Sequence, residues 1–115
     1  MRILVFGGSG MVGTNFIELT SSDSFQIINP SRKELDLMNF ALVVNFVSEK
    51  KPDLIVNCAG LVGGIKANSE RLYDFLVINT VIGFNIVAAA KKAGVKRMIN
   101  LSSSCVYPKD SPNPL

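Results

Sequence analysis

A short apolar run followed by four glycines lies near the amino terminus, and it constrains the fold more than any other feature. Residues 3–6 are continuously apolar, which is typical of a strand that a parallel sheet buries on both faces. The glycines at positions 7, 8, 10 and 13 satisfy both G-x-G-x-x-G and G-x-x-G-x-x-G, and apolar residues at helical spacing follow. This strand, turn and helix context favours a dinucleotide-binding loop over a glycine turn that only eases packing.

The chemistry of such a loop explains its glycines. A tight turn with positive φ, and the close approach of a diphosphate, both exclude a Cβ atom. The helix that follows offers its first N–H groups and the positive end of its dipole to the anion. The cofactor-binding residues predicted in this loop are Gly7, Gly10, Met11, Val12 and Gly13.

Strand-like and helix-like segments alternate along the chain, and they predict an α/β fold. We expect a Rossmann-like parallel sheet with helices on both faces, which corresponds to the first half of a doubly wound fold. Right-handed crossovers and the strand order 3-2-1-4 are expected. Strands are expected at residues 3–6, 25–28, 54–56 and 98–101. One later helix is expected to start between Asp36 and Asn39 and to reach about Lys50, and another at about 69–93, with Gly94 as a cap.

The turn after the second expected strand bears on the choice of cofactor. NAD-specific sites place Asp or Glu there to bind the ribose 2′-hydroxyl, but residues 29–33 read Asn-Pro-Ser-Arg-Lys. Arg32 and Ser31 are suited to a 2′-phosphate, although a solvated basic turn is the alternative. The sequence therefore favours NADP, with NAD less favoured. Asp36 and Leu37 lie where the adenine edge could be contacted, and Asp36 is equally suited to cap the next helix.

Composition narrows the classes of function. The chain is 48% hydrophobic and 18% charged with a net charge of +3, which is ordinary for a soluble domain and predicts no nucleic-acid partner. Its two cysteines, in apolar or small-residue surroundings, favour a reducing cytoplasm over a disulfide scaffold. The apolar runs are shorter than a bilayer requires, so no membrane partner is expected, and we expect no metal site.

Two further segments carry a family resemblance, residues 62–68 (VGGIKAN) and 103–109 (SSCVYPK). With the glycine loop, the basic turn and residues 57–60, they resemble the extended short-chain dehydrogenase/reductases, or NAD-dependent epimerase/dehydratase family. The closer likeness is to the NADP-dependent epimerase/reductases of GDP-4-keto-6-deoxymannose, the GDP-L-fucose synthase subfamily. The likeness covers this whole chain but only about the first third of a typical member. It implies a GDP-sugar substrate and places Ala59 and Gly60 in the cofactor pocket.

The resemblance also implies two catalytic residues. Ser103 matches the family's serine that hydrogen-bonds the keto oxygen of the substrate. Cys105 matches a cysteine that transfers a proton at carbon during epimerisation, and a thiol with a tuned pKa is suited to that work. From the residues alone, a serine that ends a strand and a small buried cysteine are the alternatives. Cys58 is expected inside the third strand and is interpreted as a packing residue.

The chain departs from the family at its catalytic pair. No Tyr-x-x-x-Lys is present, because Tyr73 is followed four residues later by Val77 and Tyr107 by Ser111, and the chain contains no histidine. We therefore interpret residues 1–115 as a partial dinucleotide-binding domain without its C-terminal substrate domain, and expect this chain alone to lack activity. A non-catalytic dinucleotide-binding module and another nucleotide-sugar epimerase/dehydratase remain alternatives.

Self-association is expected from two features. In relatives, helices equivalent to residues 69–93 help to form a homodimer, and the strand at 98–101 would be an exposed edge that invites pairing. We therefore expect a homodimer or a higher oligomer. Burial against the sheet of the same chain is the alternative for most of the apolar helix residues, which are Phe75, Ile78, Ile82, Ile86 and Val87.

Overall fold

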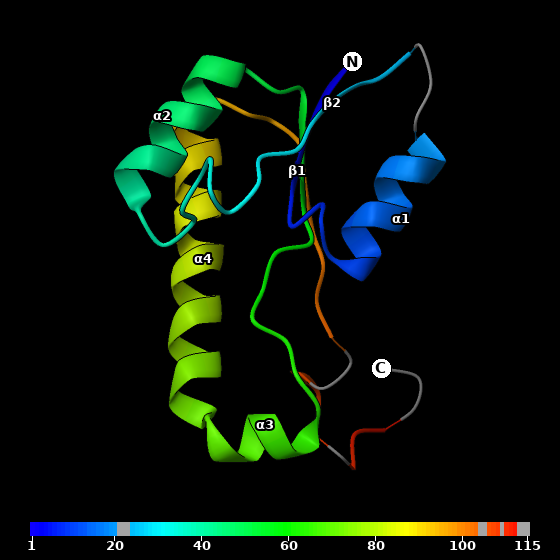
Figure 1. Ribbon diagram of the computed structural model, residues 1–115, viewed down its shortest axis with the longest axis vertical. Coiled ribbons are helices and arrows are strands. Elements are labelled where there is room, and N and C mark those ends of the chain that lie inside the picture. Colours follow the sequence, from blue (N-terminus) through cyan, green and yellow to red (C-terminus); the bar gives the residue numbers. More distant parts are fainter. Residues whose placement is uncertain (21–23, 104–105, 109, 113–115) are drawn as a thin grey trace.

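The computed structural model describes residues 1–20, 24–103, 106–108 and 110–112. Within those residues, helices flank a four-stranded parallel sheet (Figure 1). The strands are β1 (Arg2–Phe6), β2 (Gln26–Ile28), β3 (Leu54–Asn57) and β4 (Met98–Asn100). The helices are α1 (Met11–Thr20), α2 (Phe40–Lys50), α3 (Ile65–Glu70) and α4 (Leu72–Lys92). The predicted Rossmann-like α/β fold is confirmed.

The strand order is β2-β1-β3-β4, so the predicted order 3-2-1-4 is wrong. The third strand pairs with β1 and not with β2. The side chains of Ile3 to Phe6 are almost fully buried, and β1 has a paired neighbour on each side. β2 is only three residues long and exposes Gln26, which suits an edge strand.

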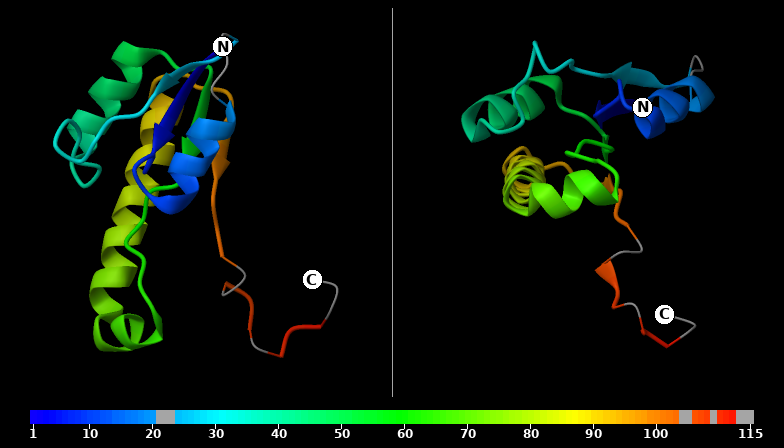
Figure 2. Two further views of the ribbon diagram at one scale, coloured as in Figure 1. Left: turned by 45° about the vertical axis from the view of Figure 1, so that its right-hand side comes forward. Right: turned by 60° about the horizontal axis from the view of Figure 1, so that its bottom comes forward.

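The direction of the crossovers explains how the helices are distributed. The connection from β1 to β2 carries α1, and the connection from β2 to β3 runs back past β1 and carries α2. Right-handed crossovers in opposite directions place their helices on opposite faces of the sheet. α4 continues in the second direction and therefore joins α2, while α1 covers the other face (Figures 1 and 2). The reversal of direction creates a topological switch point between β1 and β3.

Each face of the sheet has an apolar core. On the α1 side, Phe16 and Ile17 pack against Ile3, Val5 and Val56. The larger core lies between the sheet, α2 and α4. Its most fully buried members are Leu4, Phe6, Val43, Val47, Ile55, Ile86 and Ala89.

The expected helix at 69–93 is divided in the structure. Arg71 has φ −130° and ψ 39°, and this non-helical residue separates α3 from α4. Gly94 ends α4 with φ 72°, and the N–H of Val95 donates to the carbonyl of Ala90 over 2.9 Å, which confirms the predicted cap. The final part of α4 packs on the sheet, whereas its first part extends past the carboxyl edge of the strands (Figure 1).

The outward face of α4 differs from the expected one. Ile86 is fully buried, and Phe75, Ile78 and Ile82 are half-buried, so of the five expected residues only Val87, at 55% exposure, faces outward. The reason is that the sheet, α2 and the loop after β3 cover the other side of the helix. The large apolar residues that α4 does expose recur at helical spacing: Leu72, Tyr73, Leu76, Phe84 and Val87.

By length and composition, α4 also meets the criteria for a membrane span. It has 21 residues, and its most apolar stretch has a mean hydropathy of 1.7, contrary to the expectation that every apolar run is too short. A core helix of a soluble protein passes the same test. Here the buried residues Asn85, Ile86, Ala89 and Ala90 contact the fold, so the apolarity of the helix is weak evidence for a membrane.

Candidate dinucleotide-binding site

The loop between β1 and α1 forms a tight turn. Gly7 has φ +76°, and the N–H of Gly10 donates to the carbonyl of Gly7 over 3.0 Å. A Cβ atom at Gly7 would lie 2.6 Å from the backbone nitrogen of Ala59. The hydroxyl of Thr14 donates to the carbonyl of Gly8 over 3.0 Å and holds the other side of the turn. Gly7 is therefore required by its backbone conformation and by the strand end beside it.

The other glycines of the loop have separate roles. A Cβ atom at Gly13 would contact the carbonyl oxygen of Gly7 and lie 2.6 Å from the Cα of Gly8, so Gly13 permits α1 to pack closely. A Cβ atom at Gly8 would overlap the side chain of Asn29. Gly10 is exposed, and a Cβ there would have only the carbonyl of Gly7 nearby, at 3.3 Å. The outer side of Gly10 is thus open, as a bound anion requires.

The amino end of α1 has the electrostatics of an anion site. The first N–H groups of a helix have no acceptor within it, and they add to the positive end of its dipole. The helix begins at Met11, and its first turn contains no acidic residue. Met11 is 81% exposed and Val12 is exposed beside it. These residues fit a diphosphate whose oxygens accept from the backbone.

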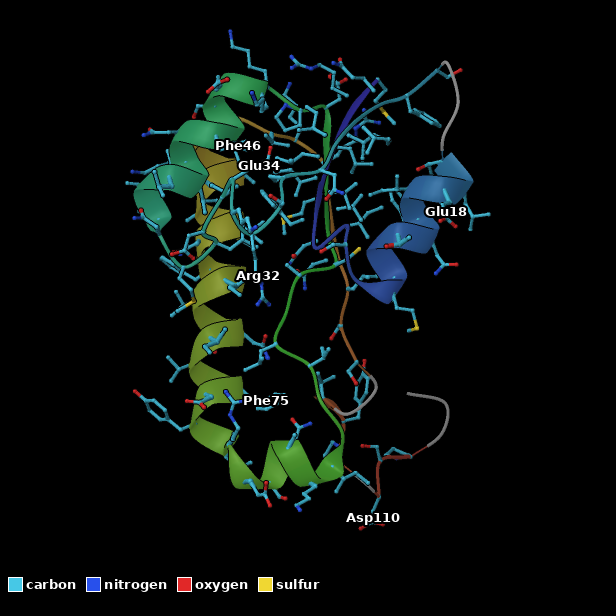
Figure 3. All side chains as sticks on the ribbon, viewed as in Figure 1. Glu18, Arg32, Glu34, Phe46, Phe75 and Asp110 are labelled. Atoms are coloured by element: carbon cyan, nitrogen blue, oxygen red, sulfur yellow. The ribbon has the colours of Figure 1, made fainter. Side chains whose placement is uncertain are left out.

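The basic turn lies beside the glycine loop. The side chain of Asn29, directly after β2, contacts Gly8. The N–H of Ser31 donates to Oε2 of Glu34 over 2.8 Å, and this hydrogen bond lowers the pKa of the Glu34 carboxyl. Arg32 is exposed, and its side chain extends toward the carboxyl end of the sheet (Figure 3). The turn therefore presents the Arg32 guanidinium at the carboxyl edge of the sheet, which is the edge that also carries the glycine loop.

Asp36 does not cap α2, so the capping role considered for it is wrong. The expected helix start at residues 36–39 holds through its last residue, which is the cap. The helix begins at Phe40, and Oδ1 of Asn39 accepts from the N–H of Leu42 over 3.2 Å, because Asn39 has the extended backbone of a cap residue. Asp36 instead accepts from the N–H of Met38 over 2.9 Å within the preceding turn.

Leu37, the other residue predicted to contact adenine, is half-buried against the core. Its carbonyl accepts from Nδ2 of Asn85 over 2.9 Å. That hydrogen bond ties the turn that follows the basic residues to α4. Asp36 and Leu37 are therefore held in a defined turn between β2 and α2.

Two asparagines hold the segment after β3, which contains Ala59 and Gly60. Oδ1 of Asn57 accepts from the N–H of Ala59 over 3.0 Å. Asn79 of α4 clamps Leu61, accepting from its N–H over 2.6 Å and donating to its carbonyl over 2.9 Å. Sequence reasoning missed Asn79, for which a polar residue within an apolar helix was the available signal. Both contacts fix the loop that faces Gly7.

The two predicted catalytic residues follow β4. Ser103 is exposed, and its carbonyl accepts from the N–H of Val106 over 3.2 Å. The chain leaves the sheet here at its carboxyl edge (Figure 2), and in a parallel sheet this is the edge that carries the glycine loop. Cys105 lies outside the described residues.

Cys58 lies directly after β3 and not within it. It is half-buried and packs against Ile3, Val5 and Val56, and burial raises the pKa of its thiol. The thiol is therefore protonated near neutral pH, in keeping with the packing role predicted for it. In the part of the chain that the structure describes, no group of three or more His, Cys, Asp or Glu side chains is arranged to hold a metal ion.

A comparison with protein families decides the membership of the chain. The model of the NAD dependent epimerase/dehydratase family matches residues 3–115. The chain belongs to this family. It is 44% identical over 110 residues to a GDP-L-colitose synthase of Yersinia pseudotuberculosis. It is 40% identical over 114 residues to a GDP-L-fucose synthase of Azorhizobium caulinodans. These matches cover 96% and 99% of this chain but only 36% of each relative.

The chain is also similar in fold to solved structures of other proteins. A GDP-mannoheptose C4 reductase from Campylobacter jejuni with NADP bound superposes with a TM-score of 0.90 at 31% identity. A GDP-D-glycero-L-gluco-heptose synthase from the same organism, solved in the presence of NADPH, gives the same two values. The matches cover 99% of this chain and 36% and 34% of those structures. The chain thus spans about a third of the length of its relatives.

Proposed function

We propose that this chain is the NADP-binding part of a cytoplasmic nucleotide-sugar epimerase/reductase that acts on GDP-4-keto-6-deoxymannose to make GDP-L-fucose. The observation that carries the proposal is the meeting of Gly7 and Ala59 at the switch point between β1 and β3. Dinucleotides bind outside the carboxyl ends of the strands at such a point in doubly wound sheets. In this reading, residues 1–115 are a partial dinucleotide-binding domain, and the substrate domain lies outside them.

The turn after β2 supports NADP over NAD. An acidic side chain there would repel a 2′-phosphate, and the residue beside the glycine loop is the neutral Asn29. Arg32 is exposed and free of ion pairs among the described residues, so its guanidinium is available for bidentate contact with a phosphate. The NADP carried by the Campylobacter reductase supports the same choice.

Each group of residues then has a task. When bound, NADPH would supply the hydride for reduction of the keto group. The backbone amides around Gly10, Met11 and Val12 would grip the diphosphate, with Gly7 and Gly13 shaping the loop. Asp36 and Leu37 would line the adenine edge, and Ala59 and Gly60 the wall of the pocket. Ser103 would hold the keto oxygen, and Cys105 would transfer a proton at carbon during epimerisation.

Titration of the chain with NADPH and NADH, followed by nucleotide fluorescence, tests the proposal. We expect NADPH to bind more tightly, and no turnover, because the sequence contains no Tyr-x-x-x-Lys pair. Tighter binding of NADH would overturn the choice of cofactor. Binding of neither nucleotide would leave the fold and the family but remove the proposed role.

The second candidate is a non-catalytic module that binds a dinucleotide and signals by shape, since the glycine loop and the basic turn would serve it equally well. The two candidates differ in what the gene encodes. An epimerase/reductase requires an open reading frame that continues past Leu115 with Tyr-x-x-x-Lys, whereas the module requires a stop codon there. If the frame continues, assays with GDP-, UDP- and dTDP-sugars would separate the proposed enzyme from another nucleotide-sugar epimerase/dehydratase.

A further inference from the structure

Two amide side chains meet at the carboxyl edge of the sheet. Asn57 is the last residue of β3 and Asn100 the last of β4, and they are paired in register. Nδ2 of Asn57 donates to Oδ1 of Asn100 over 2.8 Å. Asn57 is only 5% exposed, so its amide has exchanged water for protein partners. Burial of an amide is costly unless its polar atoms are satisfied, and both polar atoms of Asn57 have partners here.

The side-chain oxygen of Asn57 holds the loop that faces the proposed dinucleotide site. It accepts from the N–H of Ala59 over 3.0 Å, and Ala59 is the residue whose backbone leaves no space for a Cβ atom at Gly7. Asn57 thus sets the position of the strand end that faces the glycine loop. Asn57 therefore acts on the glycine loop only indirectly, because its side chain holds Ala59 and Ala59 lines the switch point.

The side chain of Asn100 contacts the segment that follows β4. Its Nδ2 donates to the carbonyl of Leu101 over 3.3 Å, and the N–H of Leu101 donates to the backbone carbonyl of Asn57 over 3.1 Å. These bonds fix the direction in which the chain leaves β4. Ser103 lies two residues beyond Leu101, so these hydrogen bonds are made directly before that segment.

We propose that Asn57 and Asn100 are a positioning pair that couples the Ala59 wall of the dinucleotide site to the start of the Ser103 segment. The part of the inference that concerns the cofactor rests on the proposed function. Two apolar side chains would fill this edge of the sheet without burying an amide, and such replacements are often neutral for stability. They would leave the N–H of Ala59 without its acceptor. We therefore assign to the amide pair the task of holding the loop after β3 in place, and not that of filling the sheet.

Amide hydrogen exchange tests the coupling without any cofactor. In Asn100→Leu the amide of Asn57 loses its acceptor and reorients, so we expect the N–H of Ala59 to exchange about tenfold faster than in the wild-type chain. Asn100→Asp keeps an oxygen acceptor and should restore slow exchange. Asn68→Leu is the control, since Asn68 donates to the carbonyls of Gly63 and Gly64 and has no hydrogen bond to Ala59. An Ala59 exchange rate that is the same in Asn100→Leu and wild type would overturn the proposal.

Nucleotide affinity then separates positioning from a merely structural role. The double variant Asn57→Leu/Asn100→Leu contains no buried side-chain amide without a partner, so we expect its melting temperature to recover toward wild type relative to Asn100→Leu, which leaves Nδ2 of the buried Asn57 unpaired. We also expect it to bind NADPH about fivefold more weakly than wild type, because Ala59 is no longer held. Wild-type affinity in a stable double variant would show that the pair only fills the sheet. If the wild-type chain binds no nucleotide, the proposed function fails, and the exchange rates alone decide whether the pair couples the two segments.

Discussion

Gly7 and Ala59 lie against each other where β1 and β3 end. A methyl group added at Gly7 would lie 2.6 Å from the backbone nitrogen of Ala59 and 2.7 Å from its Cα. Neither segment can move aside easily, because Phe6 pairs with Asn57 and the N–H of Cys58 donates to the carbonyl of Phe6 over 2.9 Å. The switch point of the sheet is therefore closed by two backbones in direct contact.

Gly7→Ala should accordingly destabilise the chain by about 2–4 kcal/mol, through overpacking and a strained positive φ. We also expect loss of NADPH binding, because the loop must shift. Urea denaturation and nucleotide titration measure the two effects. Gly83→Ala is the control: a Cβ there meets no atom within 4 Å, and alanine should stabilise α4 by about 0.5–1 kcal/mol. Wild-type stability of Gly7→Ala would contradict the packing described for the loop.

Arg32→Glu should lower NADPH affinity about tenfold or more, with little change for NADH, because in the proposed binding mode the reversed charge would face the 2′-phosphate, which NADH lacks. Competition between the two nucleotides measures the ratio. Lys33→Glu, which changes the neighbouring exposed charge by the same amount, is the matched control and should have a smaller effect. Equal losses in the two variants would mean that general charge, and not Arg32, selects the phosphate.

Asn39→Ala should lower the free energy of unfolding by about 1 kcal/mol, because the first turn of α2 loses the acceptor for the N–H of Leu42. Asn45→Ala removes an exposed asparagine from the middle of the same helix and should change stability by less than about 0.5 kcal/mol. Chemical denaturation of both variants measures the difference. The cap assignment fails if the two variants are equally stable.

Glu34 should contribute to the pH dependence of stability. Its pKa in the folded chain is lowered by the N–H of Ser31, so the unfolded chain binds its proton more readily. The contribution is present above the unfolded pKa and is lost as the pH falls from about 5 through the folded value. Glu34→Gln should flatten the melting-temperature profile in that window. Glu18→Gln, on the exposed side of α1, is the control, and identical profiles for the two variants would argue against the effect.

Self-association should occur through the outward stripe of α4. The edge strand β4, which the sequence also suggested, is only three residues long and offers few backbone groups for pairing. Leu76→Asp/Phe84→Asp places charges on that stripe and should give a monomer in sedimentation experiments, because two exposed apolar positions become charged. Ile99→Lys, at the edge strand where Ile99 is 49% exposed, should leave the oligomer intact. The opposite result would favour edge pairing, and a wild-type monomer at high concentration would exclude both.

Features with a local cause could be predicted from the sequence. The burial of residues 3–6, the glycine turn, the helix behind it and the Gly94 cap follow from neighbouring residues, because φ preference, apolar periodicity and capping act over a few positions. The family resemblance carried by residues 62–68 and 103–109 is likewise read from the chain itself. These features were sufficient for the fold class and for the location of the candidate site.

Only the tertiary structure decided how the distant parts meet. The position of β3 beside β1, the outward face of α4, the clamp of Asn79 on Leu61 and the Asn57–Asn100 pair all join residues far apart in the sequence. A strand-like segment has the same alternation whichever neighbour it pairs with, and an apolar helix residue looks the same whether a sheet or a second chain covers it. The physical reason is that strand pairing and burial are collective properties, which the local preferences of the chain do not encode.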